Sequence, residues 1–175
     1  NVRITLPENY VVAATGTLHN EEEISWMKKR KAPVAVNIPT KKTAPLNKKT
    51  VPKFPTPPSS GKMKTLHYTA DNVVDFAWSA DKRFMVKYDT CSIASNTMDV
   101  WNFILPEDEK NWNQSMLFSK RALKFYSNQL GPYPYPQVSV VASPGSVADG
   151  MEYPMLTLLN EKSGDEKTLD IIIAH

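Results

Sequence analysis

Apolar and polar residues alternate through much of the first half of this chain. In the opening segment, Val2, Ile4 and Leu6 alternate with Arg3 and Thr5. The same period of two returns at a second set of apolar positions: Val74, Phe76, Trp78, Phe84, Val86 and Tyr88. A period of two places alternate side chains on opposite faces of a strand, with the apolar set toward a core. The pattern therefore predicts antiparallel β structure for residues 1–95.

Turn-forming residues indicate how these strands connect. Pro7, Glu8 and Asn9 separate the opening segment from a second extended run, which predicts a hairpin or meander over residues 1–18. Asp81 and Lys82 separate two later alternating runs, which predicts a second hairpin there. Both predictions pair strands that are neighbours in the sequence.

The second half of the chain changes to a helical period. An apolar stripe at this spacing consists of Trp112, Met116, Leu123, Tyr126 and Leu130. The stripe predicts an amphipathic helix packed on a core, and Gly131 with Pro132 marks its end. Strands are expected at 137–142 and 155–159, and residues 168–175 form a largely apolar segment. A helix and strands that follow a β-rich half make the chain α+β.

Residues 28–64 interrupt the β pattern with many lysines and prolines and no acidic residue. Proline removes backbone donors and like charges repel, so this stretch is predicted to be an extended insertion on the surface. The functional alternative is an arm that binds a polyanion. Phe54 is the one aromatic residue in the stretch, whereas nucleic-acid stacking platforms use several. We therefore favour a solvated insertion and expect no nucleic-acid partner.

Composition is that of an ordinary soluble domain, with 41% hydrophobic and 22% charged residues among 175. No stretch is long and apolar enough to span a membrane. The lone cysteine, Cys91, cannot form an internal disulfide and is expected to be a small buried hydrophobe. The first residues already alternate as a strand does, so we expect the chain to be a piece of a larger protein, and the sequence indicates no cellular location.

Two places carry side chains suited to chemistry. Glu152 follows a glycine-containing loop, where a carboxylate can bind an ammonium group or simply meet solvent at the start of a strand. His175 ends an apolar segment, and a histidine in that setting is more often a core residue than a metal ligand. A catalytic zinc ion also needs three protein ligands. Local sequence alone therefore favours a structural role for both residues.

Three stretches occur in order along the second half: LKFYSNQLGPYPYP, DGMEYP and LDIIIAH. Together they resemble the start of the catalytic domain in the aminopeptidase N family of zinc metallopeptidases, which are gluzincins. The stretches VRITLPENYVVAATG and VVDFAWSADKRF are similar to the β-rich domain that precedes it. The resemblance implies an antiparallel β-rich domain at 1–95, followed by the start of a thermolysin-like α/β catalytic domain at 96–175.

The resemblance also implies roles for particular residues. Glu152 would bind the free amine of a peptide substrate, and Gly150 and Met151 would shape the strand beside the substrate backbone. His175 would be the first zinc ligand of a His-Glu-x-x-His helix whose other residues follow it. Tyr153 stands where the family usually has Asn, which puts strict aminopeptidase specificity in question. The parent is thus expected to be a zinc-dependent aminopeptidase, and this chain alone is expected to be inactive.

The sequence also suggests a non-catalytic alternative and allows expectations for two further histidines and for self-association. Tyr153 motivates the alternative that the protein is a non-catalytic binding or scaffolding module derived from this family. His19 and His67 fall in the β-rich half and are expected at strand or loop positions rather than at a metal. Self-association is expected from the apolar residues Ile171, Ile172 and Ile173, because the helices that should cover them would lie further along the chain.

Overall fold

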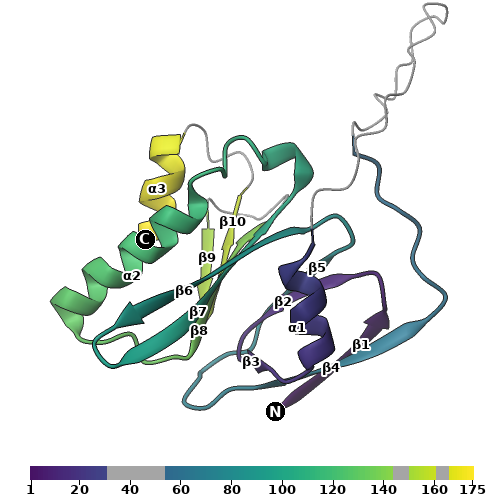
Figure 1. Ribbon diagram of the computed structural model, residues 1–175, viewed down its shortest axis with the longest axis horizontal. Coiled ribbons are helices and arrows are strands. Elements are labelled where there is room, and N and C mark those ends of the chain that lie inside the picture. The colour runs from purple at the N-terminus through teal and green to yellow at the C-terminus, as the bar shows by residue number, and fades with distance from the viewer. Residues whose placement is uncertain (31–53, 144–149, 161–165) are drawn as a thin grey trace, which may run out of the picture.

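The computed structural model describes residues 1–30, 54–143, 150–160 and 166–175, and it is α+β, as predicted (Figure 1). Most of the lysine- and proline-rich insertion lies outside these ranges. The strands are β1 Val2–Pro7, β2 Val11–Ala14, β3 Thr17–Leu18, β4 Met63–Thr69, β5 Trp78–Asp81, β6 Met85–Ile93, β7 Asn96–Ile104, β8 Gln137–Ala142, β9 Gly150–Tyr153 and β10 Leu156–Leu159. The helices are α1 Glu21–Lys28, α2 Ser115–Leu130, α3 Glu166–Ala174 and the short 3₁₀ turn Pro106–Asp108.

The first β unit consists of two small antiparallel sheets. One has the order β1-β4-β3, and the other pairs β2 with β5. Ile4 and Leu6 point into a core with Leu66 and Tyr68, which confirms the face predicted from the alternation. The predicted hairpin over residues 1–18 is wrong, because β1 pairs with β4, far along the chain. Alternation decides which face of a strand is buried but carries no information on its partner.

A five-stranded mixed sheet with the order β6-β7-β8-β10-β9 forms the centre of the molecule. β6 and β7 form an antiparallel hairpin, whereas β8 runs parallel to both β7 and β10. The hairpin predicted at Asp81 and Lys82 is wrong, because β5 pairs with β2 and β6 pairs with β7. The turn of the β6–β7 hairpin falls at Ala94, which has a positive φ. The division into two domains near residue 95 stays a prediction.

Helices α2 and α3 pack against each other on one side of this sheet (Figure 1). α2 ends at Leu130, and Gly131 follows with a φ of 106°, so the predicted stop is confirmed. The stripe is only partly buried, because Leu123 is in the core while Leu130 is 83% exposed. The apolar segment at 168–175 is a helix except for its last residue, and Leu169 anchors it in the core.

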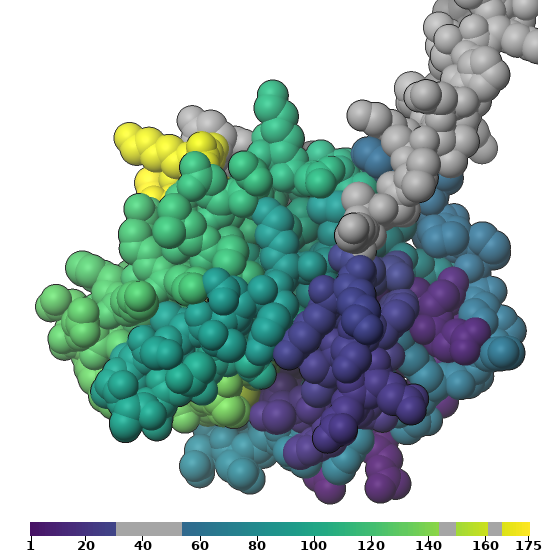
Figure 2. Space-filling view, in the orientation of Figure 1, coloured from purple at the N-terminus to yellow at the C-terminus, as the bar shows by residue number. Residues whose placement is uncertain are grey.

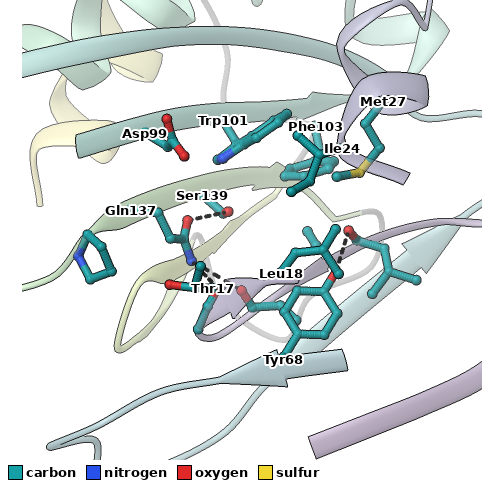
Figure 3. Close-up of a pocket in the computed structure, with 15 residues that line it drawn as sticks. Thr17, Leu18, Ile24, Met27, Tyr68, Asp99, Trp101, Phe103, Gln137 and Ser139 are labelled. Atoms are coloured by element: carbon teal, nitrogen blue, oxygen red, sulfur yellow. Dashed lines mark hydrogen bonds between the residues drawn. The ribbon is translucent and has the colours of Figure 1, made fainter. Parts of the chain in front are cut away.

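The opposite face of the five-stranded sheet packs against α1 and the first β unit. Trp101 and Phe103 share a core with Met27 of α1, and α1 lies on the visible surface between the two β units (Figure 2). A small cavity of about 80 Å³ remains at this junction (Figure 3). The side chain of Gln137 bridges it, because Nε2 donates to the carbonyl oxygens of Ala14 and Gly16 at 3.3 and 3.1 Å.

None of the helices in the described part of the chain combines the length and the apolar character that a membrane crossing needs. Cys91 is buried in a small apolar cluster, as expected for a lone cysteine. His67 lies in β4 and His19 directly follows β3, with their ring centroids 5.0 Å apart. Both histidines thus occupy the strand and loop positions predicted for them.

Candidate functional site

Glu152 lies on β9, the edge strand of the five-stranded sheet. The register across the sheet aligns Glu152 with Thr157 of β10, and Thr157 with Val140 of β8. Residues in register across a sheet project from the same face. This row reaches Asn102 of β7, whose side chain donates to Ser119 Oγ of α2. Glu152 therefore projects from the face of the sheet that α2 covers.

His175 directly follows α3 and continues its helical hydrogen bonding. Its backbone N–H donates to the carbonyl oxygens of Ile171 and Ile172. Its imidazole Nδ1 lies 3.0 Å from Oε1 of Glu152, and the two side chains are 78% and 51% exposed. The structure thus brings together the two residues that the sequence singled out, although they are 23 positions apart.

The pair opens onto a groove of about 750 Å³ between α2, the end of α3 and the sheet. Its floor includes Val138 and Val140 of β8, and one wall consists of the last turns of α2. The walls also contain Tyr126 and Leu130, the stripe residues that the core leaves exposed. The C-terminal part of the predicted stripe therefore lines a surface groove instead of packing in a core.

The connector that follows α2 forms another wall of the groove. The side chains of Tyr133 and Tyr135 meet edge to face with ring centroids 5.6 Å apart. The Tyr133 hydroxyl donates to the carbonyl oxygen of Gln137, and the Tyr135 hydroxyl donates to that of Asn72. Burial raises the pKa of Tyr133 well above its ordinary value. The sequence indicated only a stiff connector, and the tyrosines between its prolines were the available signal that it lines a groove.

The remaining predicted site residues flank Glu152 on β9. Gly150 lies close to β10, since a Cβ added to it would be 3.3 Å from a methyl group of Leu159. Met151 is 47% exposed and, like Tyr153, alternates with Glu152 along β9, and Tyr153 also borders the groove. Asp149, the first residue of the stretch DGMEYP, lies outside the described residues. Gly150, Met151 and Tyr153 thus define the edge strand, but their proposed roles toward a substrate are predictions.

The described ranges contain no cluster of three or more His, Cys, Asp or Glu side chains that could hold a metal ion. His175 is suited to be one ligand, and a catalytic zinc site needs further protein ligands. The neighbouring carboxylate suits this role, because metal-bound histidines usually direct their second ring nitrogen at a carboxylate or carbonyl oxygen. The donor set in this part of the chain is therefore incomplete for a zinc centre.

Comparison with known proteins adds information on the fold. No protein-family model and no curated protein sequence matches the chain. Among solved structures, it is similar to Legionella pneumophila aminopeptidase A in complex with aspartic acid, with a TM-score of 0.65 and 12% identity. It is also similar to a two-domain M1 zinc metallopeptidase mutant bound to L-arginine, with a TM-score of 0.56 and 17% identity. The M1 zinc metallopeptidase mutant of Deinococcus radiodurans gives a TM-score of 0.55 at 17% identity.

Each of these alignments covers 99% of this chain. The chain spans only 18% of the Legionella protein and 32% of each of the other two. At these identities the likeness shows a shared fold. The fold of this chain is therefore that of a part of M1 zinc metallopeptidases, the class to which the sequence stretches already showed a resemblance.

Proposed function

We propose that this chain forms part of the substrate site of a zinc-dependent metallopeptidase that removes N-terminal residues from peptides. In this proposal, Glu152 binds the substrate amine and His175 is one zinc ligand. The observation that carries the proposal is the contact between Glu152 and His175 at the mouth of a groove, on a fold shared with M1 metallopeptidases. The domain division at residue 95 and the incomplete state of the zinc site in this chain belong to the same proposal.

The chemistry of Glu152 suits the recognition of an amine. An ionised carboxylate only accepts hydrogen bonds, so it can accept from an ammonium group but not from another carboxylate. The ligands in two of the similar structures, L-arginine and aspartic acid, are α-amino acids with a free ammonium group. A substrate whose amine is acetylated would present a neutral amide to Glu152. Such a substrate would lose the charge-assisted hydrogen bond.

The first experiment compares leucine amide with N-acetyl-leucine amide in binding to this protein. We expect leucine amide to bind measurably, and we expect the acetylated probe to bind with an affinity lower by about tenfold or more. The variant Glu152→Gln keeps the shape of the side chain and should lower the affinity for leucine amide by a similar factor. Glu109→Gln, an exposed residue outside the groove, is the matched control and should bind as the wild type does. Equal binding of both probes would contradict the amine site.

A second measurement separates the peptidase from a non-catalytic module of the same fold. The protein isolated from its natural source should contain about one zinc ion per chain, and His175→Ala should lose it. Zinc that stays bound to His175→Ala would contradict the assignment of this histidine. Absence of zinc and of hydrolysis in the natural protein would favour the binding or scaffolding role that Tyr153 suggests.

Self-association also stays a prediction. Ile171 is 61% exposed, whereas Ile172 and Ile173 are partly buried against the core. The exposed apolar surface around α3 is therefore smaller than the sequence indicated. Light scattering at increasing concentration would show whether the chain remains a monomer.

A further inference from the structure

His19 and His67 lie opposite each other on neighbouring segments at the edge of the first β unit, where β3 pairs with β4 (Figure 1). The register of β3 with β4 ends at Leu18 and Tyr68. It continues by one position, because the backbone N–H of His19 donates to the carbonyl oxygen of His67 at 3.0 Å. The two imidazole rings have centroids 5.0 Å apart and an angle of 34° between their planes. The pair is therefore a close cross-strand contact between two histidines.

The backbone around the two histidines is held in place by Asn20. Asn20 Oδ1 accepts from the backbone N–H of His67 at 2.8 Å, and Asn20 Nδ2 donates to the carbonyl oxygen of Thr65 at 3.1 Å. The Asn20 side chain thus extends the pairing with β4 beyond the end of β3. A preformed arrangement of this kind reduces the entropy lost when a ligand bridges the two rings.

Both imidazole rings direct Nε2 toward the same end of the pair. Nε2 of His19 lies 2.7 Å from Oγ1 of Thr69, and Nε2 of His67 lies 2.9 Å from Oδ1 of Asn1. The antiparallel register of β1 with β4, continued by one residue, places Asn1 beside Thr69. The two ring nitrogens therefore lie near each other and near two side-chain oxygens.

The distance between the rings fits a single metal ion bound by both. With metal–nitrogen bonds of about 2.0–2.1 Å at an angle of about 90–110°, the centres of two bound imidazole rings lie roughly 4.5–5.2 Å apart. The centroid distance of 5.0 Å falls within this range. Imidazole nitrogen suits Cu²⁺, Ni²⁺ and Zn²⁺, whereas Mg²⁺ and Ca²⁺ prefer carboxylate and carbonyl oxygens. The geometry and the donor type thus favour a transition metal ion.

Two nitrogen ligands make a weaker site than a catalytic zinc centre with three protein ligands. No third His, Cys, Asp or Glu side chain joins the pair within the described ranges, so water and the oxygens of Thr69 and Asn1 are left to complete the coordination. His19 is exposed and His67 is half-buried, which leaves the rings accessible to an ion. Arg3 is in register with His67 but exposed, so its long side chain can extend into water. An ion held in this way would be lost on dialysis.

We infer that His19 and His67 form a binding site for one divalent transition metal ion of the class Cu²⁺, Ni²⁺ or Zn²⁺, which links β3 to β4. The ion replaces the present hydrogen bonds of the two Nε2 atoms. The site is separate from His175 and does not depend on the proposed function. It retains the strand and loop positions expected for both histidines from the sequence, and it adds a metal that the sequence did not indicate.

The test is a calorimetric titration of the untagged chain with Ni²⁺ in the His175→Gln background. This variant removes the third of the three histidines in the sequence, so that the pair supplies all remaining imidazoles. We expect one Ni²⁺ per chain and no comparable binding of Mg²⁺. Addition of His19→Gln or His67→Gln should lower the Ni²⁺ affinity about tenfold or more, because the second imidazole binds within an existing complex.

Two histidines that act independently would give a different result from a shared site. Each would bind its own ion, so the loss of one histidine would lower the number of ions bound and leave the affinity unchanged. That result would overturn the inference. Retention of the parent affinity in both the His19→Gln and the His67→Gln variants would overturn it as well.

A second measurement needs no substitution at the pair and therefore does not depend on how well the variants fold. Cu²⁺ is paramagnetic and broadens the NMR signals of nuclei close to it. In the His175→Gln background, we expect small amounts of Cu²⁺ to broaden the amide signals of residues 17–20 and 65–69 first, and those of β6 and β7 last. Broadening that begins in any other part of the chain would overturn the inference.

Discussion

Tyr88 combines three kinds of interaction on the sheet face opposite to the groove. Its ring lies 4.5 Å from that of Trp101, and Nζ of Lys28 lies 3.8 Å from the centre of the ring. Its hydroxyl donates to Oδ1 of Asp99 at 2.8 Å. Burial raises the pKa of Tyr88 to about 12, and the hydrogen bond and negative charge of Asp99 contribute in the same direction. Deprotonation would place a second anion beside Asp99.

This shift predicts a loss of stability in alkaline solution. The unfolded chain releases the Tyr88 proton near pH 10, whereas the folded protein keeps it until about pH 12. The folded state therefore binds more protons than the unfolded state in this interval, and the free energy of unfolding falls as pH rises through it. Tyr88→Phe should show a smaller fall between pH 10 and 12 in urea unfolding. The same slope in Tyr88→Phe and the wild type would contradict the prediction, and Tyr126→Phe serves as the control.

The two candidate site residues could be singled out from the sequence, but their contact could not. Glu152 and His175 were identified through short stretches that resemble a known family, and local patterns alone favoured structural roles for both. Their distance of 3.0 Å depends on the position of β9 at the sheet edge and on the way α3 packs over β10. Neither arrangement is encoded in the residues next to Glu152 or His175. Long-range packing therefore determines the contact between the two side chains, and their functional roles stay predictions.

At the scale of elements, α1 depends on tertiary contacts for its stability. It has eight residues and no side-chain hydrogen bond at its N-cap, and helices of this length are marginal in isolation. Its Glu23 forms an ion pair of 2.5 Å with Lys64 of β4, and Nζ of Lys64 lies 4.4 Å from the centre of the Trp26 ring. Desolvation raises the pKa of Glu23 and lowers the pKa of Lys64. The pair therefore offsets only part of the desolvation of its two charges.

Removal of one charge of this pair should destabilise the protein, because the other charge would stay buried without its partner. The Lys64 and Glu23 side chains are 15% and 10% exposed, so Lys64→Met leaves a carboxylate with little access to water. We expect Lys64→Met to lower the free energy of unfolding by about 2 kcal/mol. The double variant with Glu23→Gln should lose less than the sum of the two single variants. Additive losses in urea unfolding would show that the two side chains act independently.

Strands were easier to predict than their partners. The segments at 137–142 and near 155–159 were located from apolar residues, and the structure places β8 and β10 there. Both predicted hairpins were wrong, because β1 pairs with β4 and β5 pairs with β2. A local pattern specifies the faces of one strand, whereas pairing depends on the energy of the whole sheet. Only contacts distant in sequence could have corrected these predictions.

At the scale of the whole molecule, Gln137 connects the two β units. It is 6% exposed, and its Nε2 reaches the carbonyl oxygens of Ala14 and Gly16, while its Oε1 accepts from Ser139 (Figure 3). These bonds join β8 of the central sheet to the end of β2 and to the turn that follows it. The junction therefore has a polar link within a largely apolar interface.

Gln137→Met keeps the length of this side chain but removes its donors. The carbonyl oxygen of Gly16 would then lose its bond to the Gln137 amide, and we expect the free energy of unfolding to fall by about 1–3 kcal/mol. Amide hydrogen exchange should increase in β2 and β3 more than in β6 and β7, because the link joins the units and does not stabilise the β6–β7 hairpin. A uniform increase throughout the chain would contradict a local role for Gln137.

The position of β9 at the margin of the sheet has a consequence for the divergence of such proteins. β9 hydrogen-bonds to a single strand, β10, and it carries the exposed residues Met151 and Glu152. A strand with one neighbour can accept substitutions at its exposed positions with little disturbance of the core, whereas changes in β8 would affect strands on both sides. Mutation can therefore change the exposed side chains of β9 while the central scaffold persists. A short rim of this kind allows one architecture to acquire a new surface chemistry through few amino-acid changes.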